Sequence, residues 1–408
     1  MKRIYFLFFI FLGVLAYAQK NQNAAKTPPL GWNSWTWFGK NGINERIVME
    51  IIDSMSVNGL RDAGFNYIVI DGGWRDSKLG KNGELLVNQK TFPSGMKKLA
   101  DYAHSKGFKL GLHTVPGTHD CGGDKVGGFN NEEVHVKQMV DWGVDFVKLD
   151  LCINKADTCT TCKKTINGWS ECTIEEVYSK WSYLLYCSGR DILFSVSAYR
   201  FRSWNPALCN MSRTTLDMQC KSNVGTALFN NRVRKNKNYM SVLTAAILNN
   251  ESADFAGNGY WNDPEIMVTG DQGLSDNEQI SHIALWSIIT APMMLGNDPR
   301  HLLPVEKKML LNREVISINQ DPSEQGRLVV DKDEYQIWRK KLSDGNTAYL
   351  LLNISEHKRN VSLSFKDFNI AKKSRLRDVI NKTDIKNLYD NYTVVLDPNE
   401  CSFVVVMN

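Results

Sequence analysis

The sequence predicts an α/β protein, a (β/α)₈ TIM barrel followed by a C-terminal antiparallel β-sandwich domain. From residue 28 to about 320, short apolar runs alternate with helix-like segments, a pattern typical of a parallel sheet covered by helices. After "NQDP" at 319–322, short runs of alternating polarity follow one another with turn residues between them. A chain of 408 residues is long enough for one large and one small domain.

The strands expected in the first part are short apolar runs. They are "YIVIDGG" (67–73), "FKLGLHT" (108–114), "FVKLDLC" (146–152), "DILFSVSA" (191–198) and "APMMLGND" (291–298). Amphipathic segments at 96–107, 131–143 and 281–290 predict helices, and the first two end at a glycine, as helices often do.

Two fold classes fit this alternation, a doubly wound open sheet and a closed barrel. The barrel is favoured because the segment approaches the roughly 250 residues usual for that fold, and because no glycine-rich phosphate loop follows the first strand. We therefore expect the barrel to span residues 26–322 and the antiparallel domain to span 323–408.

The N-terminal segment, residues 1–18, has the features of a signal peptide. Lys2 and Arg3 precede an apolar stretch, and Ala16-Tyr17-Ala18 forms a cleavage pattern. The stretch is shorter than the roughly 20 apolar residues that span a bilayer. We expect cleavage near Ala18, a secreted or periplasmic protein, and no membrane segment in the rest of the chain.

Composition narrows the function. Hydrophobic residues make up 43% of the chain and charged residues 23%, and the net charge of +5 is spread along it, so nothing favours nucleic-acid binding. The sequence has neither an H-E-x-x-H metal motif nor a G-x-S-x-G serine elbow. We expect no metal and no cofactor, and whether the chain forms a homo-oligomer is left open.

Nine cysteines fit an oxidising compartment, and their odd number leaves at least one unpaired within the chain. Cys159, Cys162 and Cys172 crowd one segment. A zinc knuckle at Cys159-x-x-Cys162 is one interpretation, but disulfides are favoured in an exported chain. The pairing within the following set is left open: Cys159, Cys162, Cys172, Cys187, Cys209, Cys220 and Cys401.

Polar residues recur at or near the expected strand ends, where a barrel builds its active site. They are Asp71, His113, Asp150, Ser197 and Asp217. Tryptophans also lie near strand ends or loops, although core packing is the ordinary role of any one of them: Trp32, Trp35, Trp37, Trp74 and Trp261. Acids mixed with flat aromatic rings suit a polyhydroxylated ligand, so we expect carboxylate chemistry on an oligosaccharide or glycan.

Six segments, in order across nearly the whole mature chain, carry a family resemblance. They are "PPLGWNSW" (28–35), "AGFNYIVIDGGW" (63–74), "DWGVDFVKLD" (141–150), "GYWNDPEIM" (259–267), "ALWSIITAPMMLGNDPR" (284–300) and "VISINQDP" (315–322). The chain resembles glycoside hydrolase family 27, the α-galactosidases and α-N-acetylgalactosaminidases. This resemblance implies the same two-domain fold and hydrolysis of terminal α-linked galactose.

The resemblance also implies a retaining, double-displacement mechanism. The nucleophile of the family's V-K-x-D strand corresponds to Asp150, and the acid/base of its R-x-x-x-D run corresponds to Asp217, with Arg213 before it. In retaining enzymes the two carboxyl groups lie roughly 5–5.5 Å apart. Lys148 points to the same side of the strand as Asp150, so we expect it to keep Asp150 ionised and to bind a sugar hydroxyl.

Other matches concern the sugar pocket. Trp35 corresponds to the family's stacking tryptophan and Asp71 to an acid that binds a hydroxyl. Cys121 and Cys152 correspond to the disulfide that closes the pocket beside the nucleophile.

The sequence departs from the family pattern at sugar-binding positions. Gly72 replaces the second acid of I-D-D-C-W, His113 replaces a tyrosine, and Glu265 replaces the aspartate after W-N-D-P. Ser197 agrees with the N-acetylgalactosaminidases, which have Ser and Ala where galactosidases have Glu and Leu. Arg200, at the second of these positions, agrees with neither group and either hydrogen-bonds an acidic or substituted sugar or turns outward.

We therefore expect an exo-acting α-galactosidase that uses Lys148, Asp71, His113, Ser197, Arg200, Arg213, Glu265 and Trp35 to bind its substrate. One alternative is the same mechanism on an N-acetylgalactosaminide or a β-L-arabinopyranoside. A second alternative is a catalytically silent carbohydrate-binding relative, against which the intact Lys148, Asp150, Arg213 and Asp217 argue.

Overall fold

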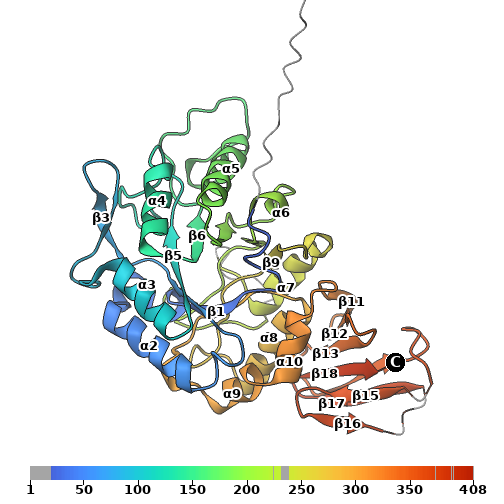
Figure 1. The fold of residues 1–408 in the computed structure, drawn as a ribbon. Coiled ribbons are helices and arrows are strands. Elements are labelled where there is room, and N and C mark those ends of the chain that lie inside the picture. Colours follow the sequence, from blue (N-terminus) through green and yellow to red (C-terminus); the bar gives the residue numbers. More distant parts are fainter. Residues whose placement is uncertain are drawn as a thin grey trace, which may run out of the picture.

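The computed structural model describes residues 20–223, 225–230, 239–372, 374–386, 388 and 390–407. The expected signal peptide, residues 1–18, lies outside the described residues. Two parts are visible in Figure 1, a parallel barrel surrounded by helices and an antiparallel domain formed by the C-terminal strands.

Eight parallel strands form the barrel sheet, in the order β10-β1-β2-β5-β6-β7-β8-β9. They are β1 (Leu30–Asn33), β2 (Tyr67–Ile70), β5 (Lys109–Thr114), β6 (Phe146–Asp150), β7 (Leu193–Ser197), β8 (Met211–Arg213), β9 (Trp261–Asp263) and β10 (Met293–Leu295). All five predicted strands are present, and β1, β8 and β9 add to them.

The sheet closes after β9. Met267 forms a parallel bridge with Leu295 of β10, and its N–H donates to the Met294 carbonyl at 2.8 Å. The Gly296 N–H donates to the Met267 carbonyl at 2.9 Å. Each strand thus lies beside the next one in the chain, and the last lies beside the first. This circular order confirms the barrel and excludes the doubly wound sheet, whose strand order reverses.

Helices follow most strands and cover the outside of the barrel (Figure 1). They are α1 (Trp35–Gly42), α2 (Glu45–Val57), α3 (Gly95–Ser105), α4 (Glu132–Trp142), α5 (Glu171–Cys187), α6 (Asn205–Leu208), α7 (Val242–Asn250), α8 (Asp276–Ile288), α9 (Pro304–Leu310) and α10 (Arg313–Gln320). Short 3₁₀ turns are η1 (Ile166–Gly168), η2 (Ala253–Phe255) and η3 (Pro299–His301), and β3 (Arg75–Leu79) pairs with β4 (Leu85–Val87) in a hairpin.

The helix ends follow from local sequence. Helix α4 stops at Gly143, which adopts φ +79°, a left-handed conformation that glycine accepts without strain. Helix α8 begins earlier than predicted because Ser275 and Glu278 form a reciprocal capping box that satisfies the first N–H groups.

The barrel interior changes from apolar to polar along each strand. One end is filled by a cluster that includes Tyr67, Val69, Phe146, Leu193, Met211, Trp261 and Met294. Successive inward-facing residues are two positions apart in a strand. The next inward positions are therefore Asp71, Lys148, Asp150, Ser197, Arg213 and Asp263. This alternation delivers charged groups to the carboxyl end of the barrel above an apolar floor.

The C-terminal domain consists of two antiparallel sheets. A six-stranded sheet has the order β11-β12-β13-β18-β15-β16, and β14 pairs with β17. The strands are β11 (Arg327–Asp331), β12 (Tyr335–Lys341), β13 (Thr347–Asn353), β14 (Arg359–Ser364), β15 (Arg375–Asp378), β16 (Thr383–Ile385), β17 (Asn391–Leu396) and β18 (Cys401–Met407). Apolar side chains of both sheets, such as Leu351, Val361, Leu363 and Val404, form one core. The predicted antiparallel sandwich is confirmed.

The two domains share a continuous apolar interface. Trp338, Leu350 and Phe403 of the six-stranded sheet belong to the same buried cluster as the barrel helices. At its edge the fully buried Lys340 ammonium donates to Thr290 Oγ1, the Ile318 carbonyl and the Asp321 carbonyl, at 2.7, 2.6 and 2.7 Å. The antiparallel domain is therefore anchored beside α8 and α10 (Figure 1).

Candidate active site

A cavity of about 270 Å³ lies at the carboxyl ends of the barrel strands. Eight of the predicted site residues line it: Trp35, Asp71, His113, Lys148, Asp150, Arg213, Asp217 and Glu265. Its volume is close to the roughly 300 Å³ at the lower end of the range for small-molecule sites, so it suits one sugar residue rather than a long chain.

Asp150 lies at the centre of a charged network. The Lys148 ammonium donates to Asp71 Oδ2 at 2.7 Å and to Asp150 Oδ2 at 3.1 Å, and His113 Nε2 lies 3.1 Å from the same Asp150 oxygen. Asp150 Oδ1 is buried and has no hydrogen-bond partner within the described part of the chain. One carboxylate oxygen is thus held by Lys148 and His113, and the other is enclosed by the protein.

This network fixes the charge of the carboxylates. Burial alone raises the pKa of Asp150, but Lys148 and then His113 outweigh it and hold that pKa well below its usual range. Lys148 likewise lowers the pKa of Asp71 against the effect of burial. The two carboxylates in turn raise the pKa of Lys148, although burial opposes them. All three groups are therefore charged at neutral pH.

A second network surrounds Arg213 on the neighbouring strands. Its guanidinium contacts Glu265 and donates to Asp217 Oδ1 at 3.2 Å. Burial raises the pKa of Glu265 to about 8 against the opposing effect of Arg213, and raises that of Asp263 to about 6. The side chain of Asp217 is 49% exposed, whereas that of Asp150 is 14% exposed. Asp150 is thus largely shielded from solvent, whereas Asp217 is exposed to it.

Ser197 and Arg200 are not part of the cavity wall. Ser197 is buried on β7 directly beside Asp150 of β6. Arg200 points away and contacts Glu171 together with Arg202. The physical reason is a bend at Tyr199, which has a φ of +60°, and it is the Tyr199 side chain that lines the cavity instead. This position corrects the prediction that Arg200 binds the substrate.

Sequence reasoning missed several residues that line the cavity, and those with polar side chains include Tyr199, Arg75, Asp120 and Lys40. Arg75 follows Trp74 directly. Its position just after the expected strand 67–73 could have identified it as a site residue. Of the five tryptophans considered, Trp35 lines the cavity, whereas Trp32, Trp74 and Trp261 are completely buried in the core.

Two loops at the cavity wall are joined covalently. Cys121, after β5, forms a disulfide with Cys152, after β6, with their Cα atoms 4.8 Å apart. Both cysteines line the cavity. The predicted pairing is confirmed, and it explains why a cysteine follows Asp150 by two residues.

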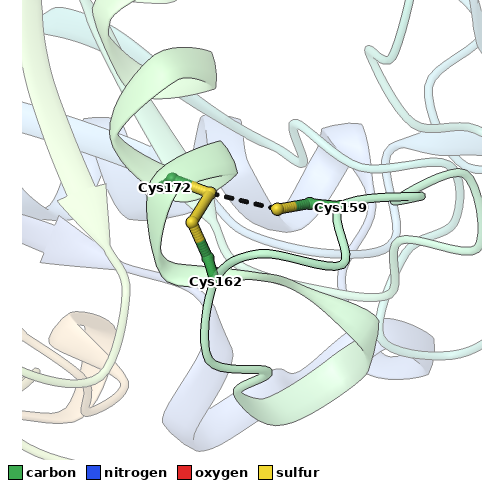
Figure 2. A group of neighbouring side chains, drawn as sticks. All are labelled: Cys159, Cys162 and Cys172. Carbon is green, nitrogen blue, oxygen red and sulfur yellow. Dashed lines mark hydrogen bonds between the residues drawn. A yellow bond between two sulfur atoms is a disulfide. The ribbon is translucent and has the colours of Figure 1, made fainter.

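A second disulfide joins Cys162 to Cys172 in the segment before and at the start of α5. Figure 2 shows the Cys159 sulfur beside it, 3.3 Å from Cys172 Sγ. Because Cys162 is used in this bond, the segment forms a disulfide, as favoured, rather than a zinc knuckle. Five cysteines are outside any disulfide in the described ranges: Cys159, Cys187, Cys209, Cys220 and Cys401.

Asp71, His113 and Asp150 present ligand atoms close enough together to hold a metal ion. However, the Lys148 ammonium already lies between the two carboxylates at hydrogen-bond distance. Its positive charge takes the place that a cation would fill, so these residues do not fit a metal ion. In the described part of the chain, no helix is long and apolar enough to cross a bilayer.

Comparison with known proteins agrees with this geometry. The family model described as "Alpha galactosidase A" matches residues 27–321, and the one described as "Alpha galactosidase C-terminal beta sandwich domain" matches residues 332–406. The α-galactosidase of Cyamopsis tetragonoloba is 32% identical over 92% of this chain and 83% of its own length. Human α-galactosidase A is 32% identical, over 81% of this chain and 75% of its own length.

Solved structures of similar fold also include an α-galactosidase-like protein. A putative α-galactosidase from Bacteroides fragilis superposes with a TM-score of 0.83 at 29% identity, covering 94% of this chain and 79% of that one. Barrel, carboxylates and relatives together define a glycoside hydrolase. The chain belongs to the α-galactosidase family, glycoside hydrolase family 27.

Proposed function

We propose that the protein is an exported, retaining exo-α-galactosidase with Asp150 as nucleophile and Asp217 as acid/base. The observation that carries the proposal is the contrast between the two aspartates of one small cavity. Asp150 is sheltered and held ionised by Lys148, whereas Asp217 is half-exposed at the entrance beside Arg213. A nucleophile needs the first environment, and a group that exchanges protons with a leaving group and water needs the second.

In the first step, Asp150 attacks the anomeric carbon while protonated Asp217 donates its proton to the glycosidic oxygen, which leaves as an alcohol. The product is a glycosyl ester on Asp150. In the second step, Asp217 removes a proton from water, which attacks the anomeric carbon and releases Asp150. Each step inverts the configuration of the anomeric carbon, so the two steps together retain it.

The surrounding groups are proposed to hold the sugar. Lys148 and Asp71 supply a donor and an acceptor for ring hydroxyls next to the anomeric centre, and Arg213 with Glu265 does the same from the opposite network. Trp35 offers an aromatic face. His113 differs from the other groups because it contacts the nucleophile itself, so its proposed role is to position Asp150.

The test is Asp150→Ala measured on an aryl α-galactoside. We expect kcat to fall by more than about 10⁴-fold, because the covalent step is removed. Added azide should restore turnover, since it can enter the space of the lost carboxylate and attack the anomeric carbon. The exposed Asp141, which pairs with Lys137 on α4, is the control, and Asp141→Ala should retain full activity. A near-normal rate for Asp150→Ala would exclude Asp150 as the nucleophile.

A second candidate substrate, an α-N-acetylgalactosaminide, is suggested by the sequence resemblance at Ser197, although this residue is buried beside Asp150 and does not line the cavity. An α-N-acetylgalactosaminidase of Gallus gallus is 30% identical over 92% of both chains. A panel of nitrophenyl α-galactoside, α-N-acetylgalactosaminide and β-L-arabinopyranoside decides among these sugars. Binding without cleavage of any of them would instead identify a silent carbohydrate-binding relative.

Export is proposed from the N-terminal sequence. Lys2 and Arg3, the apolar stretch and Ala16-Tyr17-Ala18 together predict removal of residues 1–18. N-terminal sequencing of the protein recovered outside the cytoplasm should begin at Gln19. Recovery of the intact N-terminus in the cytoplasm would contradict the proposal.

A further inference from the structure

Arg75 is a buried cation at the cavity wall with few hydrogen bonds to its guanidinium. It is the first residue of β3, and its side chain is only 5% exposed. Its Nη1 donates to Thr114 Oγ1 at 3.1 Å, and Thr114 is its one hydrogen-bond partner among the residues that the structure describes. A guanidinium carries five N–H donors in a planar fork, so most of this donor capacity is unused.

The nearest carboxylate does not complete the site. Asp120 Oδ2 lies 3.9 Å from Arg75 Nη2, which is beyond hydrogen-bond distance. The same carboxylate accepts from the Asp124 N–H at 2.9 Å and lies 3.7 Å from the Lys40 ammonium. Lys40 has its own close partner in Asp124 at 2.6 Å. Asp120 is thus shared, and Arg75 has no carboxylate in direct contact in the described chain.

The electrostatic balance agrees with this geometry. Burial lowers the pKa of Arg75, and the surrounding carboxylates, led by Asp120 and Asp71, do not fully offset that effect. A buried charge without full compensation is unfavourable, and a bound anion would relieve it.

The cavity that Arg75 lines gives such an anion room. Gly72 lines the same cavity, three positions before Arg75. A Cβ atom placed on Gly72 would lie 3.2 Å from Trp35 Cζ3, which is tighter than ordinary contact. The indole of Trp35 therefore fills the space beside Gly72, and the room for an anion lies in the part of the cavity bordered by Arg75.

We propose that the cavity accepts an α-galactoside carrying a carboxylate or a sulfate ester on the edge of the sugar that faces Arg75. The inference rests on the proposed function and narrows its substrate class. A guanidinium binds both groups through paired N–H···O bonds, which are stronger than bonds to a neutral hydroxyl. A neutral galactoside fills the same space but leaves the buried charge of Arg75 uncompensated.

Calorimetric titration of the purified protein with D-galactose, D-galacturonate and D-galactose 6-sulfate tests the proposal without requiring turnover. At least one anionic sugar should bind 10-fold or more tightly than galactose, and the two anions distinguish a carboxylate from a sulfate substrate. Equal or weaker binding of both anions would overturn the proposal.

Two variants separate Arg75 from other sources of affinity. In Arg75→Gln the ratio of the Kd values for galactose and the preferred anion should fall to about 1, because the cation is gone. Arg200→Gln, which alters an arginine outside the cavity, is the matched control and should keep the ratio. A preference that survives in Arg75→Gln would show that Arg75 is not its source.

The two proposals fail separately. If the aryl α-galactoside is cleaved but anionic sugars are not preferred, the substrate class is wrong and the hydrolase mechanism stands. If anionic sugars bind through Arg75 but none of the aryl glycosides is cleaved, the anion site stands and the mechanism is wrong.

Discussion

Lys148 is the residue on which the charge state of the site depends. It lies between Asp71 and Asp150, and all three side chains are buried or nearly so. Removing one partner of a buried ion pair leaves an uncompensated charge in a medium of low polarity. Lys148 therefore stabilises the carboxyl end of the barrel and keeps the two carboxylates charged.

Lys148→Met should lower the free energy of unfolding by roughly 3–5 kcal/mol at pH 7. In the wild type, Asp71 and Asp150 have lowered pKa values, so their stabilising effect is present above the ordinary value of 3.8 and is lost as pH falls below it. In the variant, burial dominates and raises both pKa values. Its stability should therefore decrease as pH rises from 4 to 7, whereas that of the wild type does not.

Urea denaturation at pH 4, 5, 6 and 7 measures this difference. Lys137→Met is the control, because Lys137 forms an exposed pair with Asp141 on α4 and should contribute less than about 1 kcal/mol. If Lys148→Met is destabilised equally at pH 4 and pH 7, its effect arises from packing rather than from the two carboxylates.

The sequence predicted the site residues that lie on or at the end of strands. It did not predict the position of Arg200, which follows a backbone bend. Asp71, Lys148, Asp150 and Arg213 occupy inward positions of strands, so alternation along the sequence locates them. Arg200 could not be placed in this way, because the left-handed φ of Tyr199 is uncommon for a tyrosine and is not encoded by its residue type.

At the scale of elements, the cavity wall depends on a covalent connection between two loops. Cys121 and Cys152 are 31 residues apart in the sequence and join the loops that follow β5 and β6. The second loop comes directly after β6, the strand that ends at Asp150. Its position relative to the cavity is therefore fixed from both sides, by the strand and by the disulfide.

Replacing both cysteines, Cys121→Ser with Cys152→Ser, should destabilise the protein by about 2–5 kcal/mol. KM should rise as well, because the two loops that border the cavity are no longer held together. Thermal unfolding and steady-state kinetics under non-reducing conditions measure the two effects.

The matched control is the double variant Cys162→Ser with Cys172→Ser, which removes a disulfide that does not line the cavity. Its KM should equal that of the wild type. An unchanged KM in the Cys121/Cys152 variant would show that the strand alone positions this wall.

Element-level prediction followed residue composition. The five barrel strands that are apolar runs were located, and the runs of alternating polarity after residue 322 correctly indicated an antiparallel domain. Strands β15 and β16 were not located, because their sequences, "RLRD" and "TDI", are too short and too charged to differ from a loop. Arg75 was missed for a related reason, since "RDSKL" becomes a strand only by pairing with β4. The distance between Arg75 and Asp120 depends on how two segments 45 residues apart pack together. The sequence around either residue does not predict that packing.

At the scale of the whole molecule, Lys340 connects the antiparallel domain to the barrel. Its ammonium donates to three oxygen atoms that belong to the end of α8, to α10 and to the residue after it. Since the side chain is completely buried, no water replaces these bonds when the lysine is removed. The interface thus combines an apolar area with one polar connection.

Lys340→Met should destabilise the protein by about 2–6 kcal/mol, because buried acceptors without a donor cost about 1–3 kcal/mol each and some of the three will find other partners. Scanning calorimetry should show the antiparallel domain melting separately from the barrel. Lys341→Met, on the adjacent exposed residue, is the control and should melt like the wild type. A single unshifted transition in Lys340→Met would mean that the apolar contact alone couples the domains.

The closure of the barrel has a consequence for its motions. Around most of the barrel, neighbouring strands are joined by continuous ladders, but between β9 and β10 the connection consists of the Met267 bridge and its two backbone hydrogen bonds. Local opening of a fold begins where such bonds are fewest. We therefore expect the barrel to open locally between β9 and β10. Glu265 lies two residues before Met267, so we expect the side of the cavity formed with Arg213 to fluctuate more than the Asp150 side, where longer ladders join β5, β6 and β7.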